Sequence, residues 1–326
     1  MVAILYVLSV IVCCILLFFS AEWLTSALSR VARFLGLKEF VVAFFVMAVA
    51  GSLPNLFVDV SAALQGMPEM AFGEVVGGNV FDLTVAAALA VFFARNGIPA
   101  RGGTIQTSAI FTIVSAILPL ILILDGNLSR IDGAILIAFF FFYIFWVFSK
   151  KERFTKVYEK EEGEKLPPVK RFKVFVVDIG KVVLGIAFLL IASDIIVDLV
   201  KEFSAQFDLP IALIGVLIVG IGNSLPEFYF AINSARKGET SLILGDLMGA
   251  VIIPATMVLG VIAVIRPFDI SNFSIYALAR AALFISAMLF LVFIRTDHRI
   301  SKKEAVALLS VFMVWLLAEI FKNYKP

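Results

Sequence analysis

Acidic, amide and hydroxyl side chains stand beside prolines in the middle of two apolar stretches. The first reads AVAGSLPNLFVDV over residues 48–60, and the second reads IVGIGNSLPEFYF over residues 218–230. A proline inside a helix leaves a backbone carbonyl without its donor, and at membrane depth such a group is tolerated only within protein or beside water. Carbonyl, carboxylate, amide and hydroxyl oxygens favour hard cations such as Na⁺, Mg²⁺ and Ca²⁺. The two stretches therefore predict a cation site near the middle of a membrane.

Five acidic residues fall inside apolar stretches that contain no Lys or Arg. They are Asp59, Glu74, Asp82, Glu227 and Asp246. Unpaired carboxylates in hydrocarbon are costly, so we expect them to face the protein interior and to meet cations or protons. Glu74 and Asp246 closely follow loops, and for these two a solvated position at a span end is the alternative.

The composition of the whole chain is that of a membrane protein. Of its 326 residues, 62% are hydrophobic and 16% are charged, and the mean hydropathy is +1.05. A soluble domain of this length cannot bury so much apolar surface. The pattern predicts an all-α polytopic membrane protein with ten transmembrane helices, each able to cross about 30 Å of hydrocarbon. The expected spans are residues 2–21, 39–64, 69–94, 104–124, 130–149, 174–200, 209–235, 240–265, 272–295 and 303–322.

An offset of 172 residues aligns the two halves of the chain without gaps. It places SLPN at residues 52–55 on SLPE at residues 224–227, and Glu74 on Asp246. Because each half holds an odd number of spans, the second half should insert upside down relative to the first. We therefore expect two inverted five-helix repeats with broken helices 2 and 7, an architecture of secondary transporters that bind their substrates near the midplane.

A charged loop at residues 150–173 divides the spans into two equal sets. We expect a first repeat at 1–149 and a second at 174–326. The segment of each repeat that carries the duplicated motif, here called its α-repeat, is expected at about 39–94 in the first and at about 209–265 in the second. Loops on the side opposite the termini carry 20 of the 27 Lys and Arg residues, and the termini side carries five. The positive-inside rule therefore predicts that both termini face outside and that the central loop is cytoplasmic.

The duplicated motif resembles the α-repeats of the sodium/calcium exchangers, within the calcium/cation antiporter superfamily. The family pattern is roughly G-T-S-L-P-E followed by G-N-x-x-G-S-N-x-x-N/D. This chain has AGSLPN with GEVVGGNVFD, and GNSLPE with GDLMGAVIIP, and the likeness covers essentially its whole length. The resemblance implies that Asn55, Asp82, Glu227 and Pro254 occupy the ion positions at the midplane. In this chain Asn55 replaces a glutamate and Pro254 has no ligand side chain, so the resemblance is to a prokaryotic-type member with substituted site residues.

The residues and the resemblance together give the candidate site. The expected metal ligands are Ser52, Asn55, Asp82, Asn223, Ser224 and Glu227. The candidate ion-path residues or proton carriers are Asp59, Glu74, Asn79 and Asp246.

The resemblance implies a secondary antiporter, and not an enzyme, that exchanges Na⁺ for Ca²⁺ by alternating access as spans one and six slide. A proton-coupled exchanger of Ca²⁺ or another divalent cation is the alternative, because the acids gained at Glu74 and Asp246 suit a proton carrier. A relative that binds ions without exchanging them also stays open. The LGD sequence at 244–246 lacks the first glycine of an intramembrane aspartyl protease motif, because that position is Ile243.

The resemblance also implies which cofactors, partners and cellular location we should expect. We expect no catalytic residue and no covalent cofactor, only transported Ca²⁺ and Na⁺, or H⁺, as bound ions. The expected partners are inorganic cations and the lipid bilayer of a prokaryotic plasma membrane, without nucleic acid. The oligomeric state is left open, and a monomer would suffice.

Overall fold

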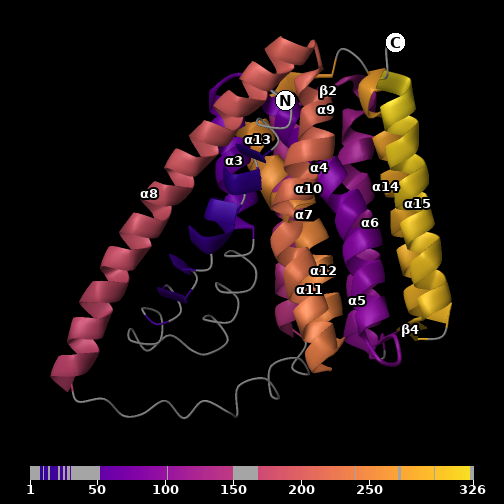
Figure 1. Cartoon of the computed structure of the whole chain (residues 1–326), viewed down its shortest axis with the longest axis horizontal. Coiled ribbons are helices and arrows are strands. Elements are labelled where there is room, and N and C mark those ends of the chain that lie inside the picture. The colour runs from indigo at the N-terminus through magenta and orange to yellow at the C-terminus, as the bar shows by residue number, and fades with distance from the viewer. Residues whose placement is uncertain are drawn as a thin grey trace.

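Eight helical segments in the described part of the chain are long and apolar enough to cross a membrane, and they pack into one bundle (Figure 1). The computed structural model describes residues 8–9, 11–13, 15–20, 23–24, 26–27, 30, 52–100, 102–149, 168–238, 240–270, 273–296 and 298–323. The eight segments are Pro68–Phe93, Ile105–Asp125, Arg130–Val147, Phe175–Phe207, Ile211–Lys237, Ile243–Ile265, Ser274–Thr296 and Lys302–Lys322. Two shorter apolar helices, Ile11–Ser20 and Leu53–Leu64, fall on the first and second expected spans.

In the first half of the chain, a continuous series of described elements begins at Leu53, inside the SLPN motif. Its elements are α3 (Leu53–Leu64), α4 (Pro68–Phe81), the π-helix η2 (Asp82–Ala86), α5 (Ala87–Phe93), β1 (Ile98–Pro99), α6 (Gly103–Leu122), the 3₁₀-helix η3 (Ile123–Asp125), β2 (Asn127–Leu128) and α7 (Arg130–Ser149). The segments α4, η2 and α5 follow one another without a break and make a single span. The expected span at 39–64 lies partly outside the described residues.

From α11 onward, the second half follows the same order of helices, π-helix and strands as the first, without a counterpart of η3. Its elements are α8 (Pro168–Phe207), α9 (Ile211–Ile214), the π-helix η5 (Gly215–Val219), α10 (Gly220–Asn223), α11 (Leu225–Lys237), α12 (Thr240–Ile253), the π-helix η6 (Pro254–Val258), α13 (Leu259–Ile265), β3 (Phe268–Asp269), α14 (Phe273–Thr296), β4 (Arg299–Ile300) and α15 (Lys302–Asn323). Helix α8 is longer than the expected span at 174–200. It begins inside the stretch expected as a loop, and it continues through the polar residues after 200.

Structural details recur at the offset of 172 residues. The π-helix η2 begins at Asp82 and the π-helix η6 begins at Pro254. A π-turn interrupts the regular pattern of α-helical hydrogen bonds. In each half of the chain, a threonine hydroxyl in the π-helix donates to the backbone carbonyl four residues earlier, Thr84 to Val80 O and Thr256 to Ile252 O.

Two helices begin with equivalent capping boxes. At the start of α7, the Ser129 backbone N–H and hydroxyl donate to Asp132 Oδ2 at 2.8 and 2.7 Å. At the start of α15, the same groups of Ser301 donate to Glu304 Oε2 at 2.7 Å each. These bonds satisfy helix N–H groups that lack an intrahelical partner.

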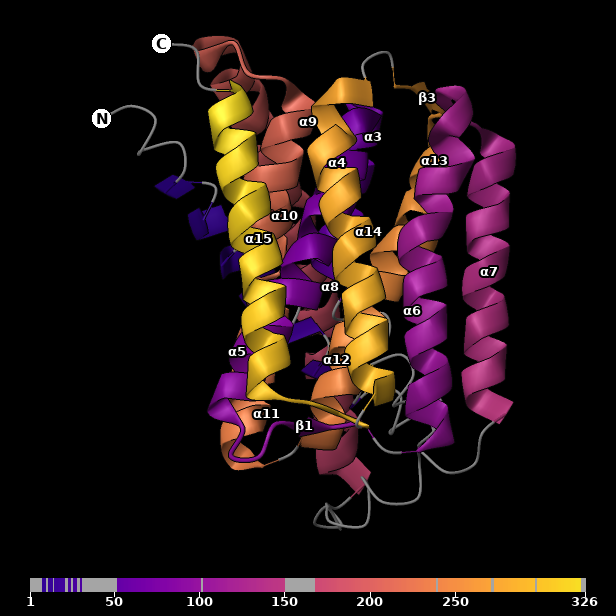
Figure 2. The same cartoon turned by 90° about the vertical axis from the view of Figure 1, so that its right-hand side faces the viewer.

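Two short antiparallel ribbons join the halves, one at each end of the bundle. Strand β1 pairs with β4 through Ile98 opposite Ile300, and β2 pairs with β3 through Leu128 opposite Phe268. Figure 1 shows β4 at the lower end and β2 at the upper end, and Figure 2 shows β1 and β3 at those same ends. Each ribbon therefore takes one strand from each half of the chain.

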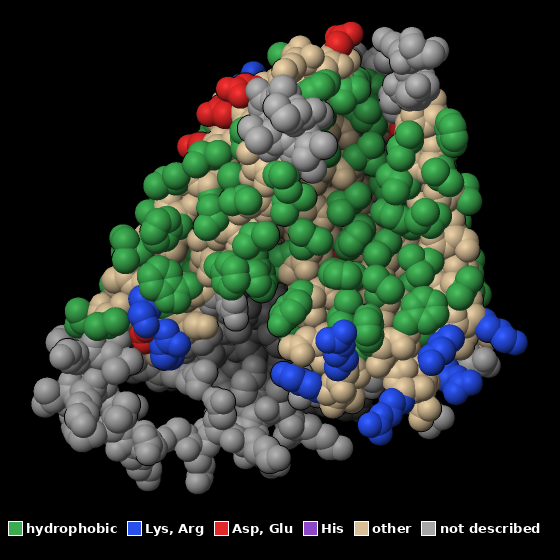
Figure 3. Space-filling view, viewed as in Figure 1, with side chains coloured by type: hydrophobic (Ala, Val, Ile, Leu, Met, Phe, Trp, Pro, Cys, Tyr) green, Lys and Arg blue, Asp and Glu red, His purple; other side chains and the backbone are tan. Residues whose placement is uncertain are grey.

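An apolar belt surrounds the bundle between two polar ends. Exposed large side chains such as Phe145, Phe188 and Val314 face outward along α7, α8 and α15. Figure 3 shows hydrophobic side chains over the middle of this face, Lys and Arg at the lower end of the bundle, and Asp and Glu along the upper part of α8. This distribution is typical of an integral membrane protein. Helix α8 is tilted and leans away from the bundle toward its lower end (Figure 1).

Candidate ion-binding site

The seventh expected span is broken at the SLPE motif. Helix α10 ends at Asn223, Ser224 forms a turn, and α11 begins at Leu225 with Pro226 in its first turn. Proline has no N–H to donate and cannot continue the hydrogen-bond ladder of α10. Asn223 and Ser224, which are both 4% exposed, therefore lie where backbone polar groups meet in the interior. In the first half, α3 likewise begins at Leu53, directly after Ser52, with Pro54 in its first turn.

Glycines allow α4 to approach this break closely. A Cβ atom on Gly73 would lie 2.4 Å from Ala212 O, and one on Gly77 would lie 1.9 Å from Val216 O. Both distances are far below van der Waals contact, so only glycine fits at these two positions. The close approach brings the polar side chains of α4 within reach of those at the break.

Two direct hydrogen bonds connect α4 to the break. Asn223 Nδ2 donates to Glu74 Oε1 at 3.0 Å, and Ser224 Oγ donates to Gly78 O at 3.4 Å. Asp82 also interacts with Ser224. Glu74 is 1% exposed. The solvated position that the sequence left open for Glu74 is therefore wrong.

The acidic side chains along this interface act on one another. Glu227 faces the charges of Asp82, Asp246 and Glu74. Asp59, which is fully buried, adjoins Glu74. Two carboxyl groups can hydrogen-bond to each other only if one of them carries a proton. Within the described part of the chain, none of these acids forms an ion pair with a Lys or Arg side chain.

Several buried oxygen atoms of the predicted site residues have no hydrogen-bond partner within the described residues. They are Asn55 Oδ1, Asp59 Oδ1 and Oδ2, Glu74 Oε2, Asp82 Oδ1, Glu227 Oε2 and Asp246 Oδ2. Buried polar atoms are normally hydrogen-bonded, so each exception needs an explanation. No three His, Cys, Asp or Glu side chains of the described part lie close enough together to hold a metal ion. A cation at this place would thus need amide, hydroxyl or backbone oxygens besides the carboxylates.

The predicted site residues divide into two sets in the structure. A hydrogen bond links Glu74 with Asn223, and electrostatic interactions couple Glu74 with Asp59, Ser224 with Asp82, and Glu227 with Asp82 and Asp246. No described hydrogen bond links Ser52, Asn55 or Asn79 side chains to these groups, although each is buried, at 7%, 8% and 2% exposure. Pro254, the fourth position of the family pattern, begins the π-helix η6.

A polar chain between α3 and α8 was not predicted. Ser61 Oγ donates to Asp194 Oδ1, Gln65 Nε2 donates to Ser61 Oγ at 3.2 Å, and Lys201 Nζ donates to Gln65 Oε1. Asp194 lies well inside α8. The four-residue spacing of Ser61 and Gln65 on one helix face was the available signal.

Comparison with known proteins agrees with this arrangement. The family described as sodium/calcium exchanger protein matches this chain over residues 5–149 and 178–321. The sodium/calcium exchanger MaX1 of Methanosarcina acetivorans is 24% identical over 331 residues, covering 91% of this chain and 93% of its own length. The inner membrane protein YrbG of Escherichia coli is 26% identical over 318 residues and covers 93% of both chains.

Solved structures share the fold. A structure of the sodium-calcium exchanger NCX_Mj, soaked with Na⁺ and Sr²⁺, matches 97% of both chains with a TM-score of 0.62 at 21% sequence identity. The family match covers most of the chain in two stretches. The chain therefore belongs to the sodium/calcium exchanger family, whose members are membrane transporters and not enzymes.

Proposed function

We propose that this protein is a secondary antiporter that exchanges Ca²⁺ for Na⁺, with the ions bound where α4 meets the α10–α11 break. The observation that carries the proposal is the set of buried carboxylate and amide oxygens without partners at this interface. A cation supplies the partner that each of these atoms lacks, and hard cations prefer oxygen ligands.

Each half would contribute one carboxylate to this site. Asp82 and Glu227 supply the negative charge, and Ser52, Asn55, Asn223 and Ser224 supply neutral oxygens. Two carboxylates balance one divalent ion or two monovalent ions, so Ca²⁺ and Na⁺ would compete for the same ligands. Pro254 offers no side-chain ligand, which leaves the second copy dependent on Glu227.

The architecture that we propose is a pair of inverted five-helix repeats, at 1–149 and 174–326. The two separate family matches, the equivalent π-helices and the equivalent capping boxes support it. The excess of Lys and Arg at the end of the bundle that holds β1 and β4 supports a cytoplasmic position for that end. Both termini would then face outside, in a prokaryotic plasma membrane.

Access would alternate through sliding of the N-terminal span and α8 against the other helices. The contacts of α8 support this assignment, because its main neighbour among the described elements is α3. The bundle of α4–α7 and α11–α15 is tied together by the two ribbons, so relative motion is expected at α8.

The test is uptake of radioactive calcium into proteoliposomes that carry an outward Na⁺ gradient. Wild-type protein should take up calcium only when the gradient is present, and Glu227→Gln should lose this uptake. Glu69→Gln, an acid in the first turn of α4, is the matched control and should behave as the wild type. Absence of gradient-dependent uptake, or uptake by Glu227→Gln equal to that of the parent, contradicts the proposal.

A proton-coupled exchanger is the second candidate, and the burial of Asp59 beside Glu74 favours it. Both carboxyl groups are almost completely buried, and a shared proton would satisfy them without a metal ion. Replacing the Na⁺ gradient by a pH gradient in the same vesicles separates the two candidates. Calcium uptake driven by neither gradient would indicate a relative that binds ions without exchanging them.

A further inference from the structure

The polar chain between α3 and α8 joins two opposite charges of α8 through side chains of α3. Lys201 Nζ donates to Gln65 Oε1, and Gln65 Nε2 donates to Ser61 Oγ at 3.2 Å. Ser61 Oγ in turn donates to Asp194 Oδ1. Each group donates to the next, so the hydrogen bonds run in one direction from the ammonium to the carboxylate. The two charges lie about 10 Å apart along the axis of α8, and the described bonds between them run through α3.

Asp194 lies in the membrane-spanning part of α8, which extends over Phe175–Phe207. About 20 Å of helix axis separates this residue from Phe207 at the end of the helix. Asp194 is exposed, whereas Ser61 is 8% exposed. A charged side chain at this depth is costly unless a polar partner compensates it. Ser61 supplies such a partner only while α8 keeps its present position on α3.

A displacement of α8 along α3 would break this chain. Sliding by half a helical turn moves a side chain by about 2.7 Å along the axis. A donor and an acceptor that lie more than about 3.5 Å apart no longer form a hydrogen bond. The bond from Ser61 to Asp194 therefore marks one position of α8 and cannot persist at another.

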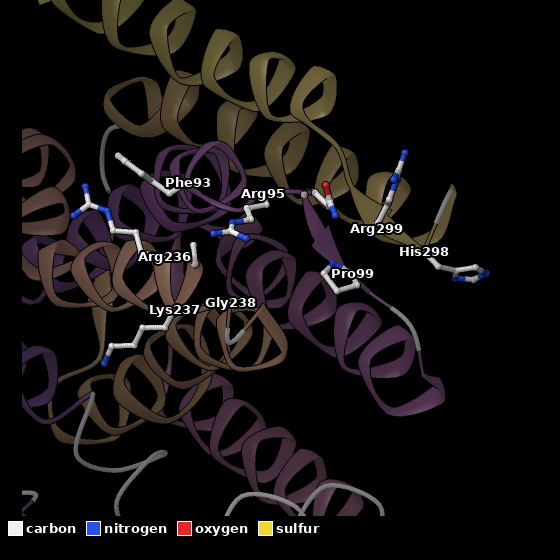
Figure 4. A pocket seen from close by; sticks show the side chains of 11 residues that line it. Phe93, Arg95, Pro99, Arg236, Lys237, Gly238, His298 and Arg299 are labelled. Carbon is white, nitrogen blue, oxygen red and sulfur yellow. The ribbon is translucent and has the colours of Figure 1, made fainter.

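The lower end of the bundle is built without α8. There the two halves meet around a pocket of about 730 Å³, which Phe93 of α5, Pro99 of β1, Arg236 of α11 and Arg299 of β4 help to line (Figure 4). No lining residue of this pocket belongs to α8, and α8 leans away from the bundle toward this end (Figure 1). The main neighbours of α8 among the described elements are α3 and α9. The polar chain thus lies where α8 has its main contact with the bundle.

We propose that this polar chain is a latch that holds α8 at one position on α3, and that the latch opens in each transport cycle. The inference rests on the proposed sliding of α8. Asp194 and Lys201 are then positioning residues, which act on the exchanged ions only through α3, the helix that carries Asn55. An interaction made in one conformation alone stabilises that conformation, so a weaker latch should let α8 leave its position faster.

Calcium uptake into proteoliposomes under an outward Na⁺ gradient measures this effect. Asp194→Asn keeps the shape of the side chain but removes its charge, and Ser61→Ala removes the donor. Each should raise the maximal rate about tenfold, the factor that corresponds to one hydrogen bond to a charged group. The double variant should be no faster than either single variant, because both changes break the same bond. A purely structural role would lower the rate or leave it unchanged.

The matched control for these variants is Asp198→Asn. Asp198 lies one turn further along α8, where it pairs with Lys201 at 3.7 Å and has no described hydrogen bond to α3. This variant should keep the wild-type rate. A rise as large as that of Asp194→Asn would mean that charge on α8 in general, and not the bond to Ser61, sets the rate.

A cross-link across the latch tests the movement itself. In a background with Cys13→Ala and Cys14→Ala, a short bis-methanethiosulfonate reagent joins the cysteines of Ser61→Cys/Asp194→Cys. The link should stop calcium uptake, and cleavage by a reducing agent should restore it. Asp194→Cys/Asp198→Cys, whose link stays within α8, is the control and should keep its uptake after cross-linking.

Continued uptake by the cross-linked Ser61→Cys/Asp194→Cys protein would overturn the proposal, because α8 would then stay at Ser61 during exchange. A rate of Asp194→Asn equal to or below that of the wild type would also contradict it. Absence of uptake by the wild type would instead contradict the proposed function. In that case the cross-linking yield tests the latch alone: it should differ between Na⁺ and Ca²⁺, and equal yields in the two ions would rule the latch out.

Discussion

The amide at position 55 decides how charge is distributed in the proposed ion site. Asn55 is 8% exposed, and its Oδ1 atom has no hydrogen-bond partner within the described residues. An amide oxygen can coordinate a cation but cannot balance its charge. The carboxylates of Asp82 and Glu227 must therefore attract the ion, and Asn55 would refine its coordination.

Replacing Asn55 by alanine should weaken cation binding while leaving transport intact. A neutral ligand that contributes about 1.4 kcal/mol to the free energy of Ca²⁺ binding lowers the half-saturating Ca²⁺ concentration tenfold, so its loss should raise that concentration about tenfold. The maximal rate should stay close to that of the wild type. The Ca²⁺ dependence of uptake into proteoliposomes measures both quantities. Ser286→Ala, which truncates a buried hydroxyl of α14 without a partner, is the control. An unchanged Ca²⁺ dependence in Asn55→Ala would remove this side chain from the site.

At the scale of elements, close contact between α4 and η5 depends on the absence of side chains. A Cβ atom on Gly77 would overlap Val216 O, and one on Gly215 would lie 2.5 Å from Met70 O. Both partners are backbone atoms, which cannot rotate away as a side chain can. The helices themselves would have to separate, and the hydrogen bond from Asn223 to Glu74 spans this same contact.

Gly77→Ala should therefore destabilise the protein. Overpacking of an interior contact costs about 1–3 kcal/mol of unfolding free energy, and separation of the helices should also reduce calcium uptake. Gly180→Ala is the matched control, because a Cβ atom on Gly180 in α8 meets no described heavy atom within 4 Å. Thermal unfolding midpoints of both variants in one detergent give the comparison. An unaltered midpoint for Gly77→Ala would mean that α4 and η5 lie farther apart than described.

Most elements could be predicted from the sequence, because apolar length determines a membrane span. The expected span at 69–94 corresponds to Pro68–Phe93, and the one at 303–322 corresponds to Lys302–Lys322. The π-helices could not be predicted, since a π-turn differs from an α-turn by one residue that only packing can decide. The far end of α8 was also missed, because polar residues there gave no apolar signal.

The residues of the candidate site could be predicted from the sequence, but the contacts between them could not. Buried acids and the paired SLP motifs identified Asp82, Glu74 and Glu227. The bond between Glu74 and Asn223 joins residues 149 positions apart, and no local pattern predicts such a pair.

At the scale of the whole molecule, one ion pair links the segment after the expected first span to α8. Arg30 Nε and Nη2 donate to the two Asp178 carboxylate oxygens at 2.8 Å each, and the Asp178 side chain is 2% exposed. A bidentate interaction of this kind fixes the orientation of the guanidinium relative to the carboxylate as well as the distance between them. The two segments that we propose to slide would then move together.

Asp178→Asn should slow transport without changing ion affinity. Removing one partner of a buried pair leaves an unbalanced charge, and a barrier raised by about 1.4 kcal/mol slows exchange about tenfold. Rates and half-saturating concentrations of calcium uptake measure the two effects separately. Asp198→Asn breaks an exposed ion pair with Lys201 on the same helix and should have no effect. A changed affinity in Asp178→Asn would instead connect Asp178 to the ion site.

The two ribbons have a consequence for how the chain is made. Neither half holds both strands of either ribbon, so each half alone would expose two short strands whose backbone groups lack their partners. Two separately encoded fragments, cut within 150–167, should therefore be degraded when expressed singly and should copurify when expressed together. If a gene encoded only one half, two copies of that half would have to insert into the membrane in opposite orientations. The two copies would have to pair before either could fold.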